Sequence, residues 1–116
     1  AITNYLKNPS PTNPVSLKYG YPIGTWCVSQ LPHFLRIFSP RNNDYSHLYE
    51  KFNEPLDGWD VSSAISLQGM FDGAKAFNQD LSMWNVSRVR DFRECFRGAE
   101  SFNQNLSTWD MSSAIV

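Results

Sequence analysis

The residues best able to do chemistry recur at a fixed interval along this 116-residue sequence. Asp60, Asn85 and Asp110 are spaced by 25 residues, and Cys27 takes the same place 33 residues before Asp60. Carboxylates can bind metal ions or act as acid–base pairs, but we expect Asp60 and Asp110 to lie two repeats apart, about 10 Å at strand spacing. That separation is too large for a shared metal ion or for paired catalysis on one bond. The row is predicted to be a mildly acidic surface rather than a catalytic centre.

The usual sequence signatures of enzymes and metal centres are missing. His33 and His47 lie far apart, and neither has a metal-ligand partner at short spacing. There is no phosphate-binding glycine loop, zinc pattern or nucleophile elbow. Cys27 and Cys95 are too few for a disulfide scaffold, and we expect Cys27 on the surface and Cys95 in the core, where they cannot pair. We therefore predict no enzyme, no metal and no cofactor.

Charge and hydropathy exclude several classes of partner. The net charge is −1, from 10 Lys and Arg against 11 Asp and Glu, so there is no overall footprint for nucleic acid or an anionic membrane. No apolar run reaches the roughly 20 residues that a membrane-spanning helix needs. A basic stripe is interleaved with acidic residues, which favours an exposed face with ion pairs over a nucleic-acid site. A partner with an acidic patch stays open for this stripe, which consists of Arg88, Arg90, Arg93 and Arg97.

An internal repeat of 25 residues organises the sequence. Trp59, Trp84 and Trp109 mark three copies, and neighbouring Leu, Phe, Asn and Ser residues keep the same step. An earlier copy contains Trp26, and its extra residues fall at 39–49, where proline and asparagines predict a loop insertion. The units start at residues 23, 56, 81 and 106, and the last is cut off at Val116.

Two periodicities within each unit predict its local structure. The alternation in Leu-x-x-Trp-x-Val favours a strand with Trp and Val on one side. Ala64, Leu67, Phe71 and Ala74 have the spacing of one buried helix face. The sequence therefore predicts an α/β fold, a right-handed leucine-rich-repeat-like solenoid of parallel strands and short helices. It should contain about three full repeats and a partial one.

These motifs resemble the BspA-type leucine-rich-repeat family, a surface-protein repeat domain of unknown function. The resemblance covers about residues 20–116 and is carried by the run from Phe77 to Ser87 and by Val89, Phe92, Phe96, Gly98, Ala99 and Phe102. Tyr19 to Trp26 is similar to the entry into such arrays in marine algae, especially diatoms. The resemblance implies a non-enzymatic protein of the cell surface or a secreted one, used in adhesion and protein contacts. Glu54 departs from the usual Gln, as do Cys27 and the 39–49 insertion.

The strand-lined face is the predicted contact surface, because it is rigid and regular. It would receive a basic or polar protein partner or a saccharide hydroxyl, and a solvated face without a partner stays open. Its outward-facing candidates are Thr25, Cys27, Asp60, Met83, Asn85, Thr108 and Asp110. Asn85 and Asn105 match the N-glycosylation pattern as by-products of the repeat, and the recurring Asn53, Asn78 and Asn103 are predicted to form a structural ladder.

The two ends of the sequence suggest an alternative function. Residues 1–22 are rich in proline and are predicted to form an extended cap or arm over the first repeat. The chain starts at Ala1 and stops within the fourth unit, so we expect either further repeats in the natural chain or neighbours that order both ends. The second case would make it an accessory structural subunit docked on a large assembly, such as a membrane or photosynthetic complex in an organelle. The compartment itself is open.

Overall fold

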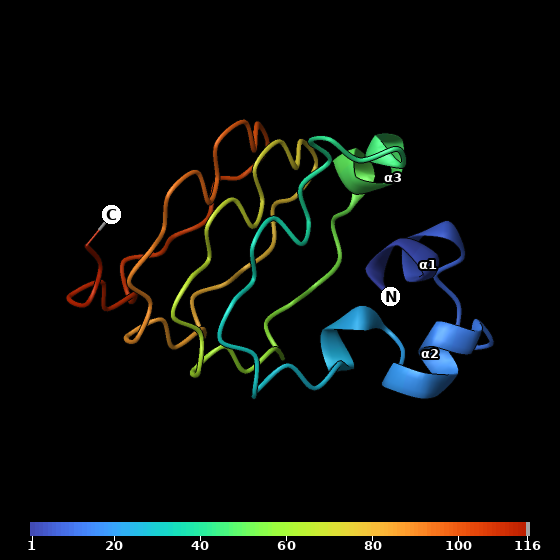
Figure 1. Ribbon diagram of the computed structural model, residues 1–116, viewed down its shortest axis with the longest axis horizontal. Helices are drawn as coiled ribbons and strands as arrows, with labels where there is room; N and C mark the ends of the chain where they lie inside the picture. The colour runs from blue at the N-terminus through green and yellow to red at the C-terminus, as the bar shows by residue number, and fades with distance from the viewer. Residues whose placement is uncertain (116) are drawn as a thin grey trace.

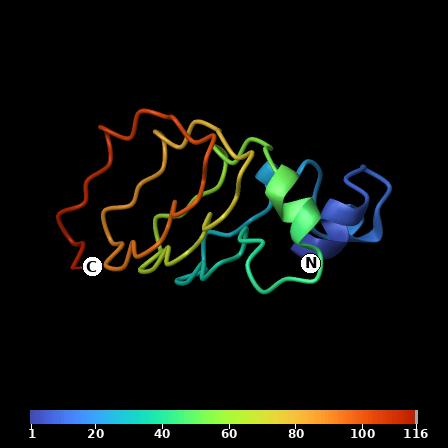
Figure 2. The same ribbon diagram turned by 90° about the horizontal axis from the view of Figure 1, so that it is seen from above.

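Stacked coils of irregular backbone form the body of the molecule, and short helices cover one end of the stack (Figure 1). The computed structural model describes residues 1–115. We call residues 23–55 coil 1, residues 56–80 coil 2 and residues 81–105 coil 3, and residues 106–115 begin a further turn. The helices are α1 (Ile2–Lys7), α2 (Pro14–Tyr19), the 3₁₀ helix η1 (Ile23–Thr25) and α3 (Ser46–Lys51). Both views place α1 and α2 at one end of the stack and the C-terminus at the other (Figures 1 and 2).

The α/β solenoid of parallel strands and short helices that the sequence predicted is wrong. Residues 1–115 contain no β-strand, and the pairing between coils is limited to isolated parallel bridges that join His33 to Ser66 and Ser66 to Asp91. The segments with helical spacing, such as residues 64–74, form successive tight turns instead. Each copy of the repeat nevertheless makes one coil that stacks on the next.

The hydrogen bonds of coil 2 explain why neither regular element forms. The N–H groups of Gly69, Phe71 and Gly73 donate to carbonyl groups of coil 3, at 2.9, 2.8 and 2.6 Å. The N–H groups of Met70 and Asp72, which lie between them, turn back three residues within their own coil. A helix needs every amide to bond four residues back, and a strand needs an extended chain, so this alternation excludes both. Gly69 marks the break, with a φ of +62° in the left-handed region.

Columns of aromatic side chains run through the stack and form much of its core. Phe38, Phe71 and Phe96 stack with nearly parallel rings whose centroids are 5.6 and 5.5 Å apart. A second column has ring centroids 5.9 and 6.0 Å apart and consists of Phe52, Phe77 and Phe102. The helix-like spacing of these residues in the sequence therefore reported burial correctly, because turns of three residues also return side chains to one face.

Each repeat tryptophan is bonded to the coil before it. The indole N–H groups of Trp59, Trp84 and Trp109 each donate at 2.9 Å to a main-chain carbonyl, and the acceptors are Ile23, Leu56 and Leu81. The indole therefore supplies the link between coils where the sequence suggested a strand ladder. Burial of an indole with its N–H paired contributes both apolar area and a satisfied hydrogen bond.

The recurring asparagines form the predicted ladder. The side-chain oxygen of Asn53 accepts from the Asn78 amide, and that of Asn78 accepts from the Asn103 amide, both at 2.9 Å. The side-chain amides of Gln79 and Gln104 donate to the same two oxygens. This prediction from the sequence is confirmed, and the ladder fixes the register between successive coils.

Residues 1–22 form a helical cap rather than an extended arm. Tyr5 of α1 is fully buried, and its hydroxyl accepts from the Ile23 amide at 3.1 Å and donates to Glu54 at 2.7 Å. Glu54 takes the place that Gln79 and Gln104 hold in the next two coils, so this departure from the repeat serves the cap. The cap thus satisfies the first amide of coil 1, which has no preceding coil.

The insertion at 39–49 is partly helical, because α3 begins within it, and it binds the cap. The hydroxyls of Thr3 and Tyr49 are 2.6 Å apart, and the Lys7 ammonium donates to the Tyr45 hydroxyl at 3.1 Å. Figure 1 shows α3 beside the cap end of the stack. The insertion therefore ties coil 1 to α1 instead of forming an isolated surface loop.

Candidate interaction surfaces

One exposed edge of the stack carries all seven residues predicted to contact a partner. It lies where each coil turns around its buried Trp and Val, and we call it the turn edge. Trp59 and Val61 are buried, whereas the residue between them, Asp60, is exposed. The alternation read from the sequence is therefore right, although the backbone is a turn and not a strand. The members of the turn edge are Thr25, Cys27, Asp60, Met83, Asn85, Thr108 and Asp110, all exposed.

Short side-chain turns hold the polar members of this edge. The carboxylates of Asp60 and Asp110 accept from the amides of Ser62 and Ser112, each at 3.0 Å. Hydrogen bonds from the serine side chains and amides lower the pKa of both carboxyls, so they stay ionised. Asn85 accepts from the Ser87 amide in the same way, which explains its match to the glycosylation pattern. The edge thus offers fixed acceptors at one place in successive coils.

Methionine gives the turn edge an apolar element. Met83 is 79% exposed and holds the place of Thr25 and Thr108 in the neighbouring copies. A flexible, polarisable thioether that projects from a fixed base is suited to contact with an irregular protein surface. Exposed apolar groups of this kind, beside rigid acceptors, favour binding over catalysis.

The two cysteines are both free and have opposite environments. Cys27 is exposed on the turn edge, and Cys95 is buried in coil 3, as predicted. Hydrogen bonds with Ser29 lower the pKa of the Cys27 thiol, whereas burial raises that of Cys95 to about 12. Cys27 is therefore the reactive thiol of the described residues.

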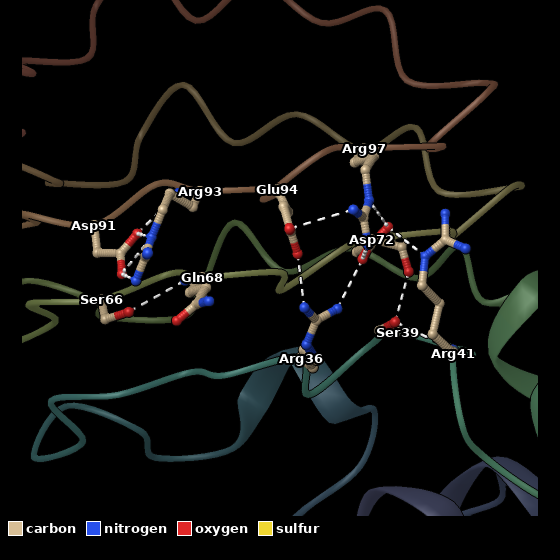
Figure 3. A network of polar contacts seen from close by, with 10 residues as sticks. All are labelled: Arg36, Ser39, Arg41, Ser66, Gln68, Asp72, Asp91, Arg93, Glu94 and Arg97. Atoms are coloured by element: carbon tan, nitrogen blue, oxygen red, sulfur yellow. Dashed lines mark hydrogen bonds and ion pairs between the residues drawn. The ribbon is translucent and has the colours of Figure 1, made fainter. Parts of the chain in front are cut away.

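The stripe of arginines predicted on one helix face is divided between different roles. Arg93 pairs with Asp91 at 2.9 Å, and Arg97 reaches Asp72 of coil 2 at 2.7 Å (Figure 3). Arg88 and Arg90 are exposed and make no ion pair within residues 1–115. The predicted ion pairs are present, but they join coils and do not line a helix.

A buried carboxylate that the sequence reading missed is the centre of this network. Asp72 is fully buried and accepts from Arg36 at 2.7 Å, from Arg41 at 2.6 Å and from Arg97 (Figure 3). Glu94 bridges Arg36 and Arg97 at 2.6 and 3.2 Å. Burial alone would raise the pKa of Asp72, but the hydrogen bonds from the three arginines outweigh it and hold the pKa at about 2. The network ties coils 1, 2 and 3 together on their outer side.

A groove of about 540 Å³ lies between the cap and the first coils. Its lining is mainly aromatic and includes Trp26, Phe34 and Trp59, with His33 and Cys27 as polar members. In residues 1–115, no group of three or more His, Cys, Asp or Glu side chains is placed to hold a metal ion. None of the helices in this part of the chain is long and apolar enough to cross a membrane.

The sequence profile of a family described as "Mycoplasma protein of unknown function, DUF285" matches residues 16–115. The chain belongs to the DUF285 family. DUF285 is related to the BspA-like repeat proteins, which confirms the predicted resemblance at the level of the family; the match does not support an algal version. No curated protein and no solved structure matches the chain.

The DUF285 match divides the molecule in a way that the structure makes clear. It begins at Ser16 within α2 and covers the coils, the turn edge and the Asp72 network. Helix α1, with the buried Tyr5, lies outside it. The family profile therefore describes the stack, and the cap contact through Tyr5 and Glu54 belongs to this chain.

Proposed function

We propose that this DUF285 protein is a non-enzymatic interaction module that binds a protein partner through its turn edge. The proposal is carried by the exposure of Met83 next to acceptors that side-chain turns hold in place. Neighbouring coils fix the base of every member, because the adjacent Trp and Val side chains are buried in the core. The surface is thus pre-organised, and little conformational entropy is lost when a partner binds.

The chemistry of the edge specifies the partner. Asp60 and Asp110 are ionised, and Asn85 adds a neutral acceptor, so the partner should present lysine, arginine or main-chain N–H groups. Met83 requires a shallow apolar pocket between those donors. Association should weaken as salt rises, because the charged groups are at the surface and are screened.

The reactive Cys27 allows a direct test. A thiol-linked photo-crosslinker will label Cys27 and spare the buried Cys95, which places the probe on the turn edge without any mutation. After illumination in an extract of the source cells, we expect a discrete cross-linked protein. An excess of unlabelled chain should compete for that protein, and an excess of the Met83→Ser, Asp60→Asn chain should not.

A second labelling position is the control. In the Cys27→Ser, Leu17→Cys chain the probe sits on α2, where Leu17 is 75% exposed and far from the turn edge in sequence. Equal capture from both positions, or equal competition by the doubly substituted chain, would contradict the proposal. Both variants change only exposed side chains, and matching thermal unfolding curves would show that the fold is intact.

A further inference from the structure

Main-chain donors at the outer side of coil 3 lack the acceptors that their counterparts in coil 2 have. In coil 2, the amides of Gly69, Phe71 and Gly73 all donate to the next coil. The residues 25 positions later are Glu94, Phe96 and Gly98, and none of their amides has a hydrogen-bond acceptor within residues 1–115. The alternate amides of coil 3, such as that of Cys95, turn back within the coil as in coil 2. Coil 3 therefore presents a row of donors at alternate residues.

Acceptors on the same side are also incompletely used. The carbonyl oxygens of Leu56 and Leu81 each accept two hydrogen bonds, one from an amide of their own coil and one from the tryptophan of the next. The carbonyl of Leu106 accepts only the Trp109 amide among the described residues, at 3.0 Å. The side-chain oxygen of Asn103, the next in the asparagine ladder, accepts none.

The apolar groups beside these donors and acceptors are half exposed. Phe96, Phe102 and Trp109 pack on the core from one side only, whereas Phe71 and Phe77 of coil 2 are fully buried. A hollow of about 390 Å³ lies over this region and is lined by Phe96, Leu106 and Trp109. We call this surface the end face; its members are Glu94, Phe96, Gly98, Asn103, Leu106 and Trp109.

We propose that the end face is a docking surface for a further coil of the same 25-residue repeat. Such a coil presents carbonyl groups at alternate residues, as residues 93, 95 and 97 do toward coil 2. Its Phe-Asn-Gln segment would complete the asparagine ladder, and its tryptophan would donate to Leu106. The junctions within the stack show this set of contacts, so the occupant is defined by continuity with an interface that the molecule already contains.

The polarity of the stack excludes an intact second copy of this chain as the occupant. The surface that would complement the end face is the outer side of coil 1, and the cap covers it. There the Ile23 amide bonds to Tyr5, and the Trp26 indole N–H donates to the Gly20 carbonyl at 2.9 Å. Two end faces placed against each other would oppose donors to donors. The docking coil must therefore come from a repeat that has no cap before it.

An extended chain tests this proposal. Residues 1–115 are followed by a second copy of residues 91–115, which keeps the repeat in register and supplies both the next coil and its tryptophan. Amide exchange measured by NMR should slow by at least about tenfold at Glu94, Phe96 and Gly98. In the 1–116 chain these amides should exchange faster than those of Gly69, Phe71 and Gly73, which provide the internal reference.

The matched control carries the same extension with serine in place of its phenylalanines and its tryptophan. Equal exchange at the three amides in the two extended chains would overturn the proposal, and so would a 1–116 chain that forms dimers in sedimentation through its end face. The test does not involve Cys27 or Met83. Its failure is therefore distinct from failure of the function proposed for the turn edge.

Discussion

Coil 2 and coil 3 have nearly the same sequence pattern but differ in what covers them. Phe71 of coil 2 lies between Phe38 and Phe96 and is fully buried, whereas Phe96 has a stacking partner in the phenylalanine column on one side only. The amides that bond outward from coil 2 are all satisfied, and the equivalent ones of coil 3 are not. The same residue type at the same place in the repeat thus has a different energetic weight in each coil.

This difference teaches where the stability of the fold resides. A coil without regular helix or strand has few hydrogen bonds of its own, so its order comes from the coil on either side. The cap performs that role for coil 1 through Tyr5. Stability should therefore be greatest in the middle of the stack and lowest at the end face, and the predictions below test that gradient.

The largest expected effect is at the phenylalanine column. Phe71→Ala should destabilise the protein by about 4 kcal/mol, because it removes a fully buried ring and leaves a cavity between two coils. Phe96→Ala should cost less than half of that, since water already reaches one side of the ring. Urea unfolding followed by tryptophan fluorescence measures both. Equal losses would mean that the two coils are equally covered in solution.

Acid should act on coil 2 through Asp72. Its pKa is about 2 in the folded protein, below the ordinary value of 3.8, so its contribution is present above pH 4 and is lost as the pH falls toward 2. The loss should be at most about 2 kcal/mol. Asp72→Asn should remove this part of the pH dependence and lower stability at pH 7, because three arginines lose their counter-charge. Unfolding midpoints of both chains between pH 2 and pH 7 provide the measurement, and an unchanged slope in the variant would contradict this assignment.

The covered end can be made to resemble the open end by one substitution. Tyr5→Phe keeps the buried ring but leaves the Ile23 amide without its acceptor, which should cost about 1–2 kcal/mol. Amide exchange at Ile23 should rise toward the rate at Phe96. Glu54→Gln is the matched control, because it restores the residue of the repeat and can still accept from Tyr5. If Tyr5→Phe changed neither stability nor exchange, the cap would not be satisfying coil 1.

Much of the packing was predictable from the sequence, and the backbone was not. The 25-residue step identified Trp59, Trp84 and Trp109 as equivalent, and the asparagine ladder followed from the same step. Spacings of three and four residues predicted a helix because both a helix and a chain of three-residue turns bury such side chains. Which one forms depends on whether amides such as that of Phe71 find acceptors in the next coil, and that is a property of the stack.

The Asp72 network shows a different limit. Asp72 and Arg97 hold the same place in successive copies, so their opposite charges were a usable sign of contact between coils. Arg36 and Arg41 gave no such sign, because they reach Asp72 from other positions of coil 1. Arg36 crosses coil 2 where Gly69 has no side chain, and a Cβ there would lie 2.8 Å from the Arg36 Cγ atom. The exposed turn edge, by contrast, followed directly from the alternation around each tryptophan.

The smallest effect on stability is expected at the turn edge, where coil 2 and coil 3 do not differ in burial. Met83→Ser should change the free energy of unfolding by less than about 0.5 kcal/mol, because the side chain is 79% exposed. Val86→Ser, three residues later in the same coil, should cost several times more, since that side chain is buried. Urea unfolding of the two variants compares the exposed edge with its buried base. A neutral Met83→Ser chain that no longer competes for the cross-linked partner would separate binding from folding, because a residue kept exposed at no gain in stability is then accounted for by contact with another protein. A large loss of stability in Met83→Ser would instead place this side chain in the core and remove the basis for the turn edge as a binding surface.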